Sequence, residues 1–233
     1  RSVEELTAPV VRKAMEGTDA TFHGAGREDV DALMLGGGRP FVIEVAEPRV
    51  RNVDVERLTQ DVNDFADGAV EVEGLRLATH DMVERVKEHD ASKTYRMDVS
   101  FEGSVDADAL QAAIDALDGA TIHQETPERV SHRRAAKTRT REVYEMGGQL
   151  VDEGAEDGGG DKPDESTRAV LEVHGEGGLY VKELVSGDDG RTEPSLAGEL
   201  GVDAEVTALD VLEVTGEDEP FADGAFFRAT AED

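Results

Sequence analysis

Cysteine is absent from the 233-residue chain, and aromatic residues make up only 4% of it. Without cysteine, the protein has no disulfide framework, no thiolate-bound zinc and no cysteine nucleophile, which is compatible with a cytoplasmic location. The chain also lacks an apolar run long enough to cross a bilayer and a signal-peptide pattern at its start. We therefore expect a soluble, cytoplasmic protein.

Several cofactor-binding motifs are missing as well. The sequence contains no Gly-Lys-Ser phosphate loop and no dinucleotide-binding fingerprint. Its six histidines are scattered, and no pair has metal-ligand spacing with a carboxylate. We expect neither a metal nor a cofactor. The chain begins with Arg1 rather than methionine, so we expect it to be a piece of a longer protein.

Positive charge is scarce, with 24 Lys and Arg against 54 Asp and Glu and a net charge of −30. A nucleic-acid-binding protein ordinarily carries the opposite sign. The acidic residues are spread over the whole length, however, and lysine occurs only six times. This pattern is typical of a protein from a high-salt cytoplasm, where self-repulsion is screened within a few ångströms. The net charge then indicates the habitat of the organism, and a local cluster of positive charge in so acidic a chain indicates function.

Hydrophobic periodicity predicts an α+β chain, long enough for one large domain or two small ones. A capping box of Ser2 and Glu5 starts the first helix. The expected helices cover 2–16, 54–65, 81–89, 106–117 and 195–200. The expected strands cover 39–47, 70–78, 92–101, 120–124, 142–151, 167–174 and 202–214.

The strand at 92–101 has the clearest alternation. Tyr95, Met97, Val99 and Phe101 lie on one of its faces. From this pattern alone, Tyr95 is a core or cross-strand residue.

Residues 152–166 are almost all Asp, Glu and Gly. Strand patterns lie on both sides, so we interpret this acidic, glycine-rich segment as a loosely held hairpin tip rather than a domain linker. Gly147 and Gly148, just before it, suggest a β-bulge.

The charge inverts over 129–141, which is the one basic cluster in the sequence. A charge run is usually a solvated face. In so acidic a chain, contact with phosphate groups explains it better. Its members are Arg129, His132, Arg133, Arg134, Lys137, Arg139 and Arg141.

The polar loop at 26–31 follows a short apolar segment and carries an arginine and nearby carboxylates. Loops on a rigid scaffold often hold reactive groups, and Asp29 is our candidate nucleophile. The alternative is a turn in which Asp29 accepts backbone N–H bonds.

Three stretches together resemble the pseudouridine synthases: Gly-Arg-Glu-Asp at 26–29, Lys-Thr-Tyr-Arg at 93–96 and Gly-Leu-Tyr-Val-Lys-Glu-Leu at 178–184. Longer matches are similar to the archaeal and eukaryotic branch that acts on uridines 54 and 55 of the tRNA T-loop. Those matches lie at 24–31, 38–41, 132–135, 182–188, 191–192 and 194–195. The likeness covers nearly the whole chain.

The resemblance implies an α+β pseudouridine synthase fold, with a mixed, mostly antiparallel bent sheet, flanking helices and a central cleft. It also implies that 1–233 is the C-terminal catalytic domain. The THUMP-like RNA-binding part of the family, with its cysteine zinc site, is not in this chain. The partner would be tRNA, bound by its T arm.

The resemblance also assigns roles to residues. Asp29 would attack the nucleotide, giving a covalent or glycal-like intermediate, while the flipped base stacks on Tyr95 and Lys182 pairs with Asp29. Arg27 would fill the space left by the base or contact phosphate. The remaining implied substrate contacts are Val181 and Leu209 to the base, and Arg133, Arg134, Lys137 and Arg139 to the RNA backbone.

Two other classes of function remain open. The chain could be a tRNA-binding module that is inert without its missing N-terminal part, although binding alone does not require Asp29, Tyr95 and Lys182 together. It could also be an acidic interaction protein with no RNA partner, and the basic run at 129–141 argues against that.

Overall fold

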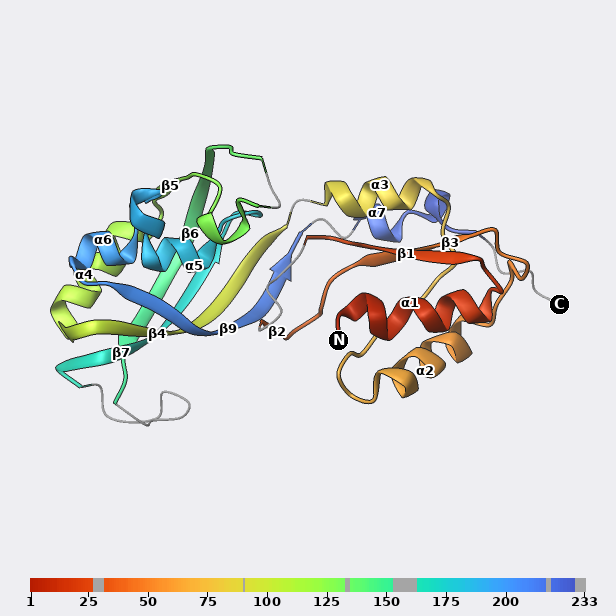
Figure 1. Ribbon diagram of the computed structural model, residues 1–233, viewed down its shortest axis with the longest axis horizontal. Helices are drawn as coiled ribbons and strands as arrows, with labels where there is room; N and C mark the ends of the chain where they lie inside the picture. The colour runs from red at the N-terminus through yellow and green to blue at the C-terminus, as the bar shows by residue number, and fades with distance from the viewer. Residues whose placement is uncertain (27–31, 90, 133–134, 153–162, 217–218, 229–233) are drawn as a thin grey trace. The chain divides into compact units, whose positions relative to one another are not determined.

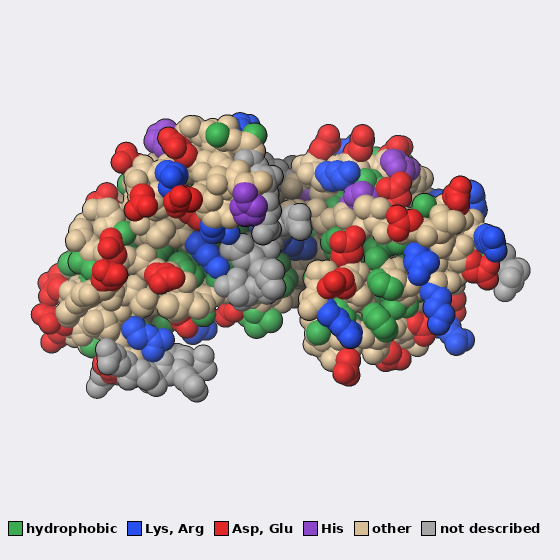
Figure 2. All heavy atoms as spheres, viewed as in Figure 1, with side chains coloured by type: hydrophobic (Ala, Val, Ile, Leu, Met, Phe, Trp, Pro, Cys, Tyr) green, Lys and Arg blue, Asp and Glu red, His purple; other side chains and the backbone are tan. Residues whose placement is uncertain are grey.

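The computed structural model describes residues 1–26, 32–89, 91–132, 135–152, 163–216 and 219–228. By packing, the chain forms two compact units (Figure 1). Unit 1 contains 1–30, 39–90 and 216–233, and unit 2 contains 31–38 and 91–215. This division describes packing and does not test the prediction that residues 1–233 form one catalytic domain, which stays a prediction. Asp and Glu side chains are spread over the visible surface of each unit (Figure 2), as the composition leads us to expect.

Unit 1 is built on a two-stranded antiparallel sheet of β1 (Asp19–Gly24) and β3 (Phe41–Ala46). The two faces of β3 have different partners. Phe41, Ile43 and Val45 pack against the cluster formed with α1 (Val3–Ala14) and α2 (Val55–Ala66), whereas Val42 packs against the cluster of α3 (Asp81–Glu88). Helices therefore cover both faces of this small sheet, as Figure 1 shows.

Local polar contacts support unit 1. The predicted capping box is present, because Ser2 N–H donates to Glu5 at 2.8 Å and Glu5 N–H donates to the Ser2 hydroxyl at 3.2 Å. The backbone hydrogen bond from Ser2 lowers the pKa of Glu5. Glu44 on β3 lies 3.0 Å from His23 and 3.1 Å from His80, and the hydrogen bond with His23 is the main cause that lowers the pKa of Glu44.

The strand predicted over 70–78 is wrong. Only Ala78 forms a β-bridge there, with Phe227 near the C-terminus. Phe227 follows α7 (Glu219–Ala222) and a 3-10 turn at Gly224–Phe226. The backbone of Val72 bonds instead to the Asn63 side chain of α2, which donates to Val72 O at 2.9 Å and accepts from Val72 N–H at 2.7 Å. A side-chain amide thus replaces a strand partner, and the alternating apolar residues pack against α2.

Unit 2 contains a seven-stranded sheet with the order β2-β9-β4-β7-β6-β5-β8. Only the pairing of β2 with β9 is parallel. Both long neighbours of β4 run antiparallel to it, so β4 is bonded along most of its length on each side. The strands are β2 (Leu33–Met34), β4 (Ser92–Asp106), β5 (Thr121–Gln124), β6 (Arg139–Leu150), β7 (Glu165–Gly175), β8 (Thr192–Glu193) and β9 (Ala204–Thr215).

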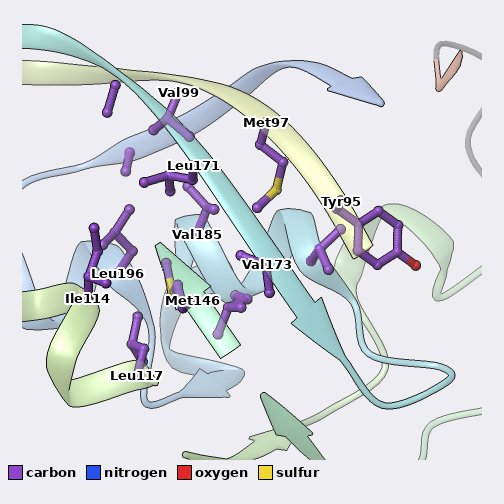
Figure 3. Close-up of a cluster of buried hydrophobic side chains, with 14 of the residues drawn as sticks. Tyr95, Met97, Val99, Ile114, Leu117, Met146, Leu171, Val173, Val185 and Leu196 are labelled. Carbon is purple, nitrogen blue, oxygen red and sulfur yellow. The ribbon is translucent and has the colours of Figure 1, made fainter. Parts of the chain in front are cut away.

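Three helices bury one face of this sheet: α4 (Ala107–Leu117), α5 (Val181–Ser186) and α6 (Leu196–Leu200). Short 3-10 turns lie at Glu128–Val130 and Asp188–Gly190. The alternation predicted for β4 is confirmed, because Tyr95, Met97, Val99 and Phe101 are all in the buried cluster. Figure 3 shows how side chains from β4 and β7 meet those of α4, α5 and α6. The α+β class and the mostly antiparallel sheet are therefore confirmed.

The irregularity in β6 is not at the predicted glycines. The register between β6 and β7 shifts at Tyr144, while Gly147 and Gly148 pair regularly. Gly148 has a different reason to lack a side chain. A Cβ there would lie 2.4 Å from the Leu171 side chain and 2.7 Å from the Val170 carbonyl.

The remaining predicted elements are present with shifted ends. Strands β4, β6 and β7 are longer than predicted, and β7 already begins at Glu165. Residues 153–162 of the acidic segment lie outside the described residues. None of the described helices is long and apolar enough to cross a bilayer.

An unpredicted element, β2, connects the two units through the chain. The ends of β1 and β3 are joined by the bond from Ala25 N–H to the Pro40 carbonyl, 3.1 Å long. Within the 26–39 segment between them, Leu33 and Met34 pair with β9 of unit 2. Leu35 N–H then donates to Val211 O at 2.8 Å, and Gly36 follows with φ of 65°. The edge strand β2 of unit 2 thus lies in the segment of chain between two strands of unit 1.

Gly36→Ala should lower the free energy of unfolding by about 1–3 kcal/mol, because alanine is strained at positive φ. Its Cβ would also lie 2.4 Å from the Leu212 carbonyl oxygen. Gly37→Ala is the matched control, since a Cβ at Gly37 meets nothing within 4 Å. Denaturant unfolding of both variants checks this. Equal stability of the two would mean that β2 is not held at Gly36.

Candidate active site in unit 2

Lys182 lies in the first turn of α5, between two buried residues. Val181 is 5% exposed and Glu183 4% exposed, while Lys182 itself is half-buried. The six-residue helix is too short to be stable by itself. Its orientation, and that of Lys182, therefore depends on contacts with the rest of unit 2.

Gln124, fully buried at the end of β5, fixes the residue before α5. Its side chain donates from Nε2 to Tyr180 O at 2.9 Å and accepts Tyr180 N–H at Oε1, also at 2.9 Å. Nε2 also lies 3.4 Å from the Thr192 hydroxyl of β8. Two parallel hydrogen bonds to one backbone residue set both the position and the direction of the chain as it enters α5.

Glu183 is the buried charge of α5, and Arg129 neutralises it. The Arg129 guanidinium binds both carboxylate oxygens, with Nε–Oε1 of 2.5 Å and Nη2–Oε2 of 3.3 Å. The Glu183 side chain is 5% exposed and that of Arg129 is 38% exposed. This fork geometry is the strong form of a charge-assisted hydrogen bond.

Tyr95 and Leu209 lie on the helix-covered face of the sheet. Tyr95 is 4% exposed and pairs with Val173 on β7 and Val211 on β9. Leu209, also 4% exposed, is the cross-strand partner of Met97. In Figure 3, Tyr95 lies at the end of the buried cluster, with its hydroxyl oxygen directed away from the other labelled side chains.

Val181 of α5 belongs to the same hydrophobic cluster as Tyr95 and Leu209. Helix α5 packs against β9, the strand of Leu209. The structure therefore brings Tyr95, Val181 and Leu209 into one buried region of unit 2, with Lys182 on the helix that borders it. The burial of Tyr95 also agrees with its simpler interpretation as a core residue.

The basic segment is tied to the sheet through Thr126, which is 7% exposed. The Thr126 hydroxyl lies 2.9 Å from Ala135 O and 3.2 Å from Lys137 O, and accepts Lys137 N–H at 3.0 Å. The side chain of Lys137 is exposed. Its backbone is thus fixed while its ammonium group faces solvent.

The arginines of this segment differ in their partners. Arg141 donates to the carbonyls of Gly177 and Thr140 and pairs with Glu176 at 3.6 Å. Arg139 lies over the Tyr180 ring, 5.4 Å from its centroid. Arg129 and Arg141 are therefore engaged in contacts within the fold, whereas the side chain of Lys137 is exposed.

Four predicted site residues lie outside the described residues: Asp29, Arg27, Arg133 and Arg134. Among the residues that the structure does describe, no group of three or more His, Cys, Asp or Glu side chains gathers to hold a metal ion.

Sequence reasoning missed Gln124, Glu183 and Arg129 as residues that position α5. One signal was available for Gln124, because it falls on the same face of its strand as the buried Ile122. A polar residue on an apolar face normally has a buried partner. Glu183 follows the charged Lys182 and carried no such signal, and its partner Arg129 lies 54 positions away and could not be predicted from spacing.

Comparison with known proteins identifies the class. A curated protein of Halorubrum lacusprofundi named tRNA pseudouridine synthase Pus10 is 66% identical over 227 residues, which cover 97% of this chain and 50% of that protein. The Archaeoglobus fulgidus protein of the same name is 46% identical, over 92% of this chain and 56% of its own length. The family model described as "Pus10, C-terminal" matches residues 1–215. The chain belongs to this family, and it spans about half the length of these relatives.

Two solved structures are similar at greater distance. One is titled as the archaeal box H/ACA sRNP Nop10-Cbf5 complex, with TM-score 0.44 and 16% identity, covering 94% of this chain and 46% of that one. The other, a Cbf5-Nop10-Gar1 complex, has TM-score 0.46 and 17% identity, covering 94% and 53%.

Gln124→Ala should lower the free energy of unfolding by about 1–3 kcal/mol, because the N–H of Tyr180 loses its Gln124 acceptor and the Tyr180 carbonyl keeps only the bond from Leu184 N–H. The control is Gln111→Ala on α4, where the exposed amide only reaches Asp115. Chemical denaturation should show a change within about 0.5 kcal/mol for the control. A similarly small change for Gln124→Ala would contradict the role given to this residue.

Proposed function

We propose that this chain is the catalytic part of a tRNA pseudouridine synthase that isomerises uridines 54 and 55 of the T-loop. The 66% identity to a curated protein named tRNA pseudouridine synthase carries this proposal. The name belongs to the full-length relatives, and this chain corresponds to about half of their length.

The reaction requires a nucleophile and a holder for the base. The bond between N1 of uracil and C1′ of the sugar breaks, and a bond from C5 to C1′ forms. The proton on C5 leaves and N1 gains one, so atoms balance without an oxidant or reductant. Asp29 would attack C1′ or assist a glycal-like intermediate, and the base, flipped out of its stack, would be held while it turns.

The length of chain between Asp29 and β2 allows the proposed role of Asp29. Met34 of β2 pairs with Val211, and Val211 pairs with Tyr95. Two strand spacings, about 10 Å, separate β2 from β4. The five residues from Asp29 to Met34 span at most about 18 Å when extended, so the chain is long enough for Asp29 to reach the Tyr95 ring.

The proposed roles of Tyr95 and Lys182 follow from unit 2. A uracil that stacks on Tyr95 would replace the protein atoms that now cover the ring and would gain roughly 1–3 kcal/mol from stacking. Val181 and Leu209 would complete an apolar wall, since both belong to the Tyr95 cluster. Lys182 would keep Asp29 ionised and oriented, because a nearby positive charge favours the carboxylate.

The RNA backbone would be held by Arg133, Arg134, Lys137 and Arg139. The exposed Lys137 on a fixed backbone supports this directly. Arg139, stacked over Tyr180, adds a second cation beside the start of α5. Arg27 would contact phosphate or fill the position of the flipped base.

Asp29→Ala should abolish pseudouridine formation while tRNA affinity changes little, because only the reacting group is lost. The assay uses an unmodified tRNA transcript at high potassium chloride, with pseudouridine mapped at each position. The control is Asp64→Ala, an exposed aspartate on α2, which should behave as wild type.

Different outcomes separate the candidate functions. Loss of tRNA binding by Asp29→Ala would give Asp29 a structural role. Binding without product from the wild-type chain would favour the inert tRNA-binding module. Product at uridines other than 54 and 55 would overturn the T-loop assignment.

Lys137→Gln should weaken tRNA binding and lower the slope of log K against log salt by about 0.7–0.9, the value of one phosphate contact. Lys87→Gln, which removes an exposed lysine of α3, is the control. Binding is measured by fluorescence anisotropy over a range of salt concentrations. Equal slopes for both variants and the wild type would show that Lys137 does not contact the RNA.

A further inference from the structure

The Arg129–Glu183 pair joins the basic segment to the helix of Lys182. Arg129 belongs to the 3-10 turn at Glu128–Val130, where the basic run begins. Glu183 follows Lys182 directly in α5. Both guanidinium–carboxylate contacts are short enough to fix the two side chains against each other.

A second ion-pair network lies beside it, and its carboxylates are more exposed than Glu183. Arg191 contacts Glu128 at 3.2 Å and Asp188 at 3.8 Å, and the Glu128 side chain is 67% exposed. Exposed pairs contribute little and are screened by salt, with a Debye length of about 3 Å at 1 M. The buried Glu183 carboxylate is screened much less. At high salt, the Arg129–Glu183 pair is therefore the stronger ionic link between the basic segment and α5.

Stability alone does not explain a buried pair. Replacement of such a pair by apolar residues of similar volume is often neutral or stabilising. Orientation offers a better reason here. Helix α5 is six residues long; Gln124 fixes its start and the buried Leu184 and Val185 hold its apolar side, while the fork on Glu183 adds a directional restraint just after Lys182.

We propose that Arg129 and Glu183 are positioning residues for the isomerisation reaction, an inference that rests on the proposed function. Glu183 takes its counter-charge from Arg129, and the pair holds the first turn of α5 and with it the backbone that carries Lys182.

Single-turnover conversion of a tRNA transcript tests this with Glu183→Gln, Arg129→Gln and Arg129→Lys. We expect Glu183→Gln and Arg129→Gln to lower the rate constant at saturating tRNA by about tenfold to a hundredfold, since small misplacements of reacting groups have effects of this size. The Kd for tRNA should stay within about threefold of wild type, because the loss is confined to the reacting state. Arg129→Lys should recover part of the rate.

Glu128→Gln and Arg191→Gln are matched controls in the neighbouring exposed network, and both should stay within about twofold of wild type. The double variant Arg129→Met with Glu183→Met addresses folding, because paired apolar residues remove both charges without leaving either one unpaired. It should fold, as judged by thermal unfolding, and should show the same loss of rate.

Wild-type rates in the folded double variant, or equal rates in the Glu183 and control variants, would overturn the inference while leaving the proposed function intact. A parallel loss of tRNA affinity and rate would reassign Arg129 to substrate binding and also overturn it. The wild type and Asp29→Ala are run in the same assay. No product from the wild type would overturn the proposed function itself, and the inference with it.

Discussion

The pairing of β4 with both β7 and β9 is the interaction on which unit 2 depends. This central strand carries a row of apolar side chains that helices cover from one side. The same row ends at Tyr95, so the strongest structural constraint in the unit also places a candidate site residue. Because its neighbours on both strands are fixed by backbone bonds, Tyr95 is held by the sheet rather than by a loop.

The other elements of the candidate site, α5 and β2, are short and are held in place by side-chain contacts. Helix α5 has too few residues to be stable alone, and β2 is an edge strand of two residues. A buried glutamine, a buried ion pair and a glycine at positive φ fix them. The order of these elements therefore depends on side-chain contacts, whereas that of β4 comes from backbone pairing on both sides.

The sequence predicted elements well where one periodicity dominated. The alternation through Tyr95 and Phe101 identified β4, and the Ser2–Glu5 pair identified the start of α1. Prediction failed where side chains replaced regular backbone pairing. Residues 70–78 alternate like a strand, yet Asn63 takes up the backbone of Val72. Strand β2 escaped prediction because two residues carry no measurable period.

Some candidate site residues could be predicted from the sequence and others could not. Lys182 and Tyr95 stood in local motifs, and each falls in unit 2 with Val181 and Leu209. The residues that support them could not be found in this way. Arg129 and Glu183 are far apart in the chain, and only the fold of β5, β6 and α5 brings their charges together.

Strand β2 belongs to unit 2 but lies in the segment between β1 and β3 of unit 1, so the two units alternate along the chain. The chain passes from one unit to the other at 30–31, 38–39, 90–91 and 215–216. A fragment of 91–215 would contain six of the seven strands of its sheet but would leave the β2 side of β9 unpaired. Neither unit can therefore be excised complete as a single contiguous fragment.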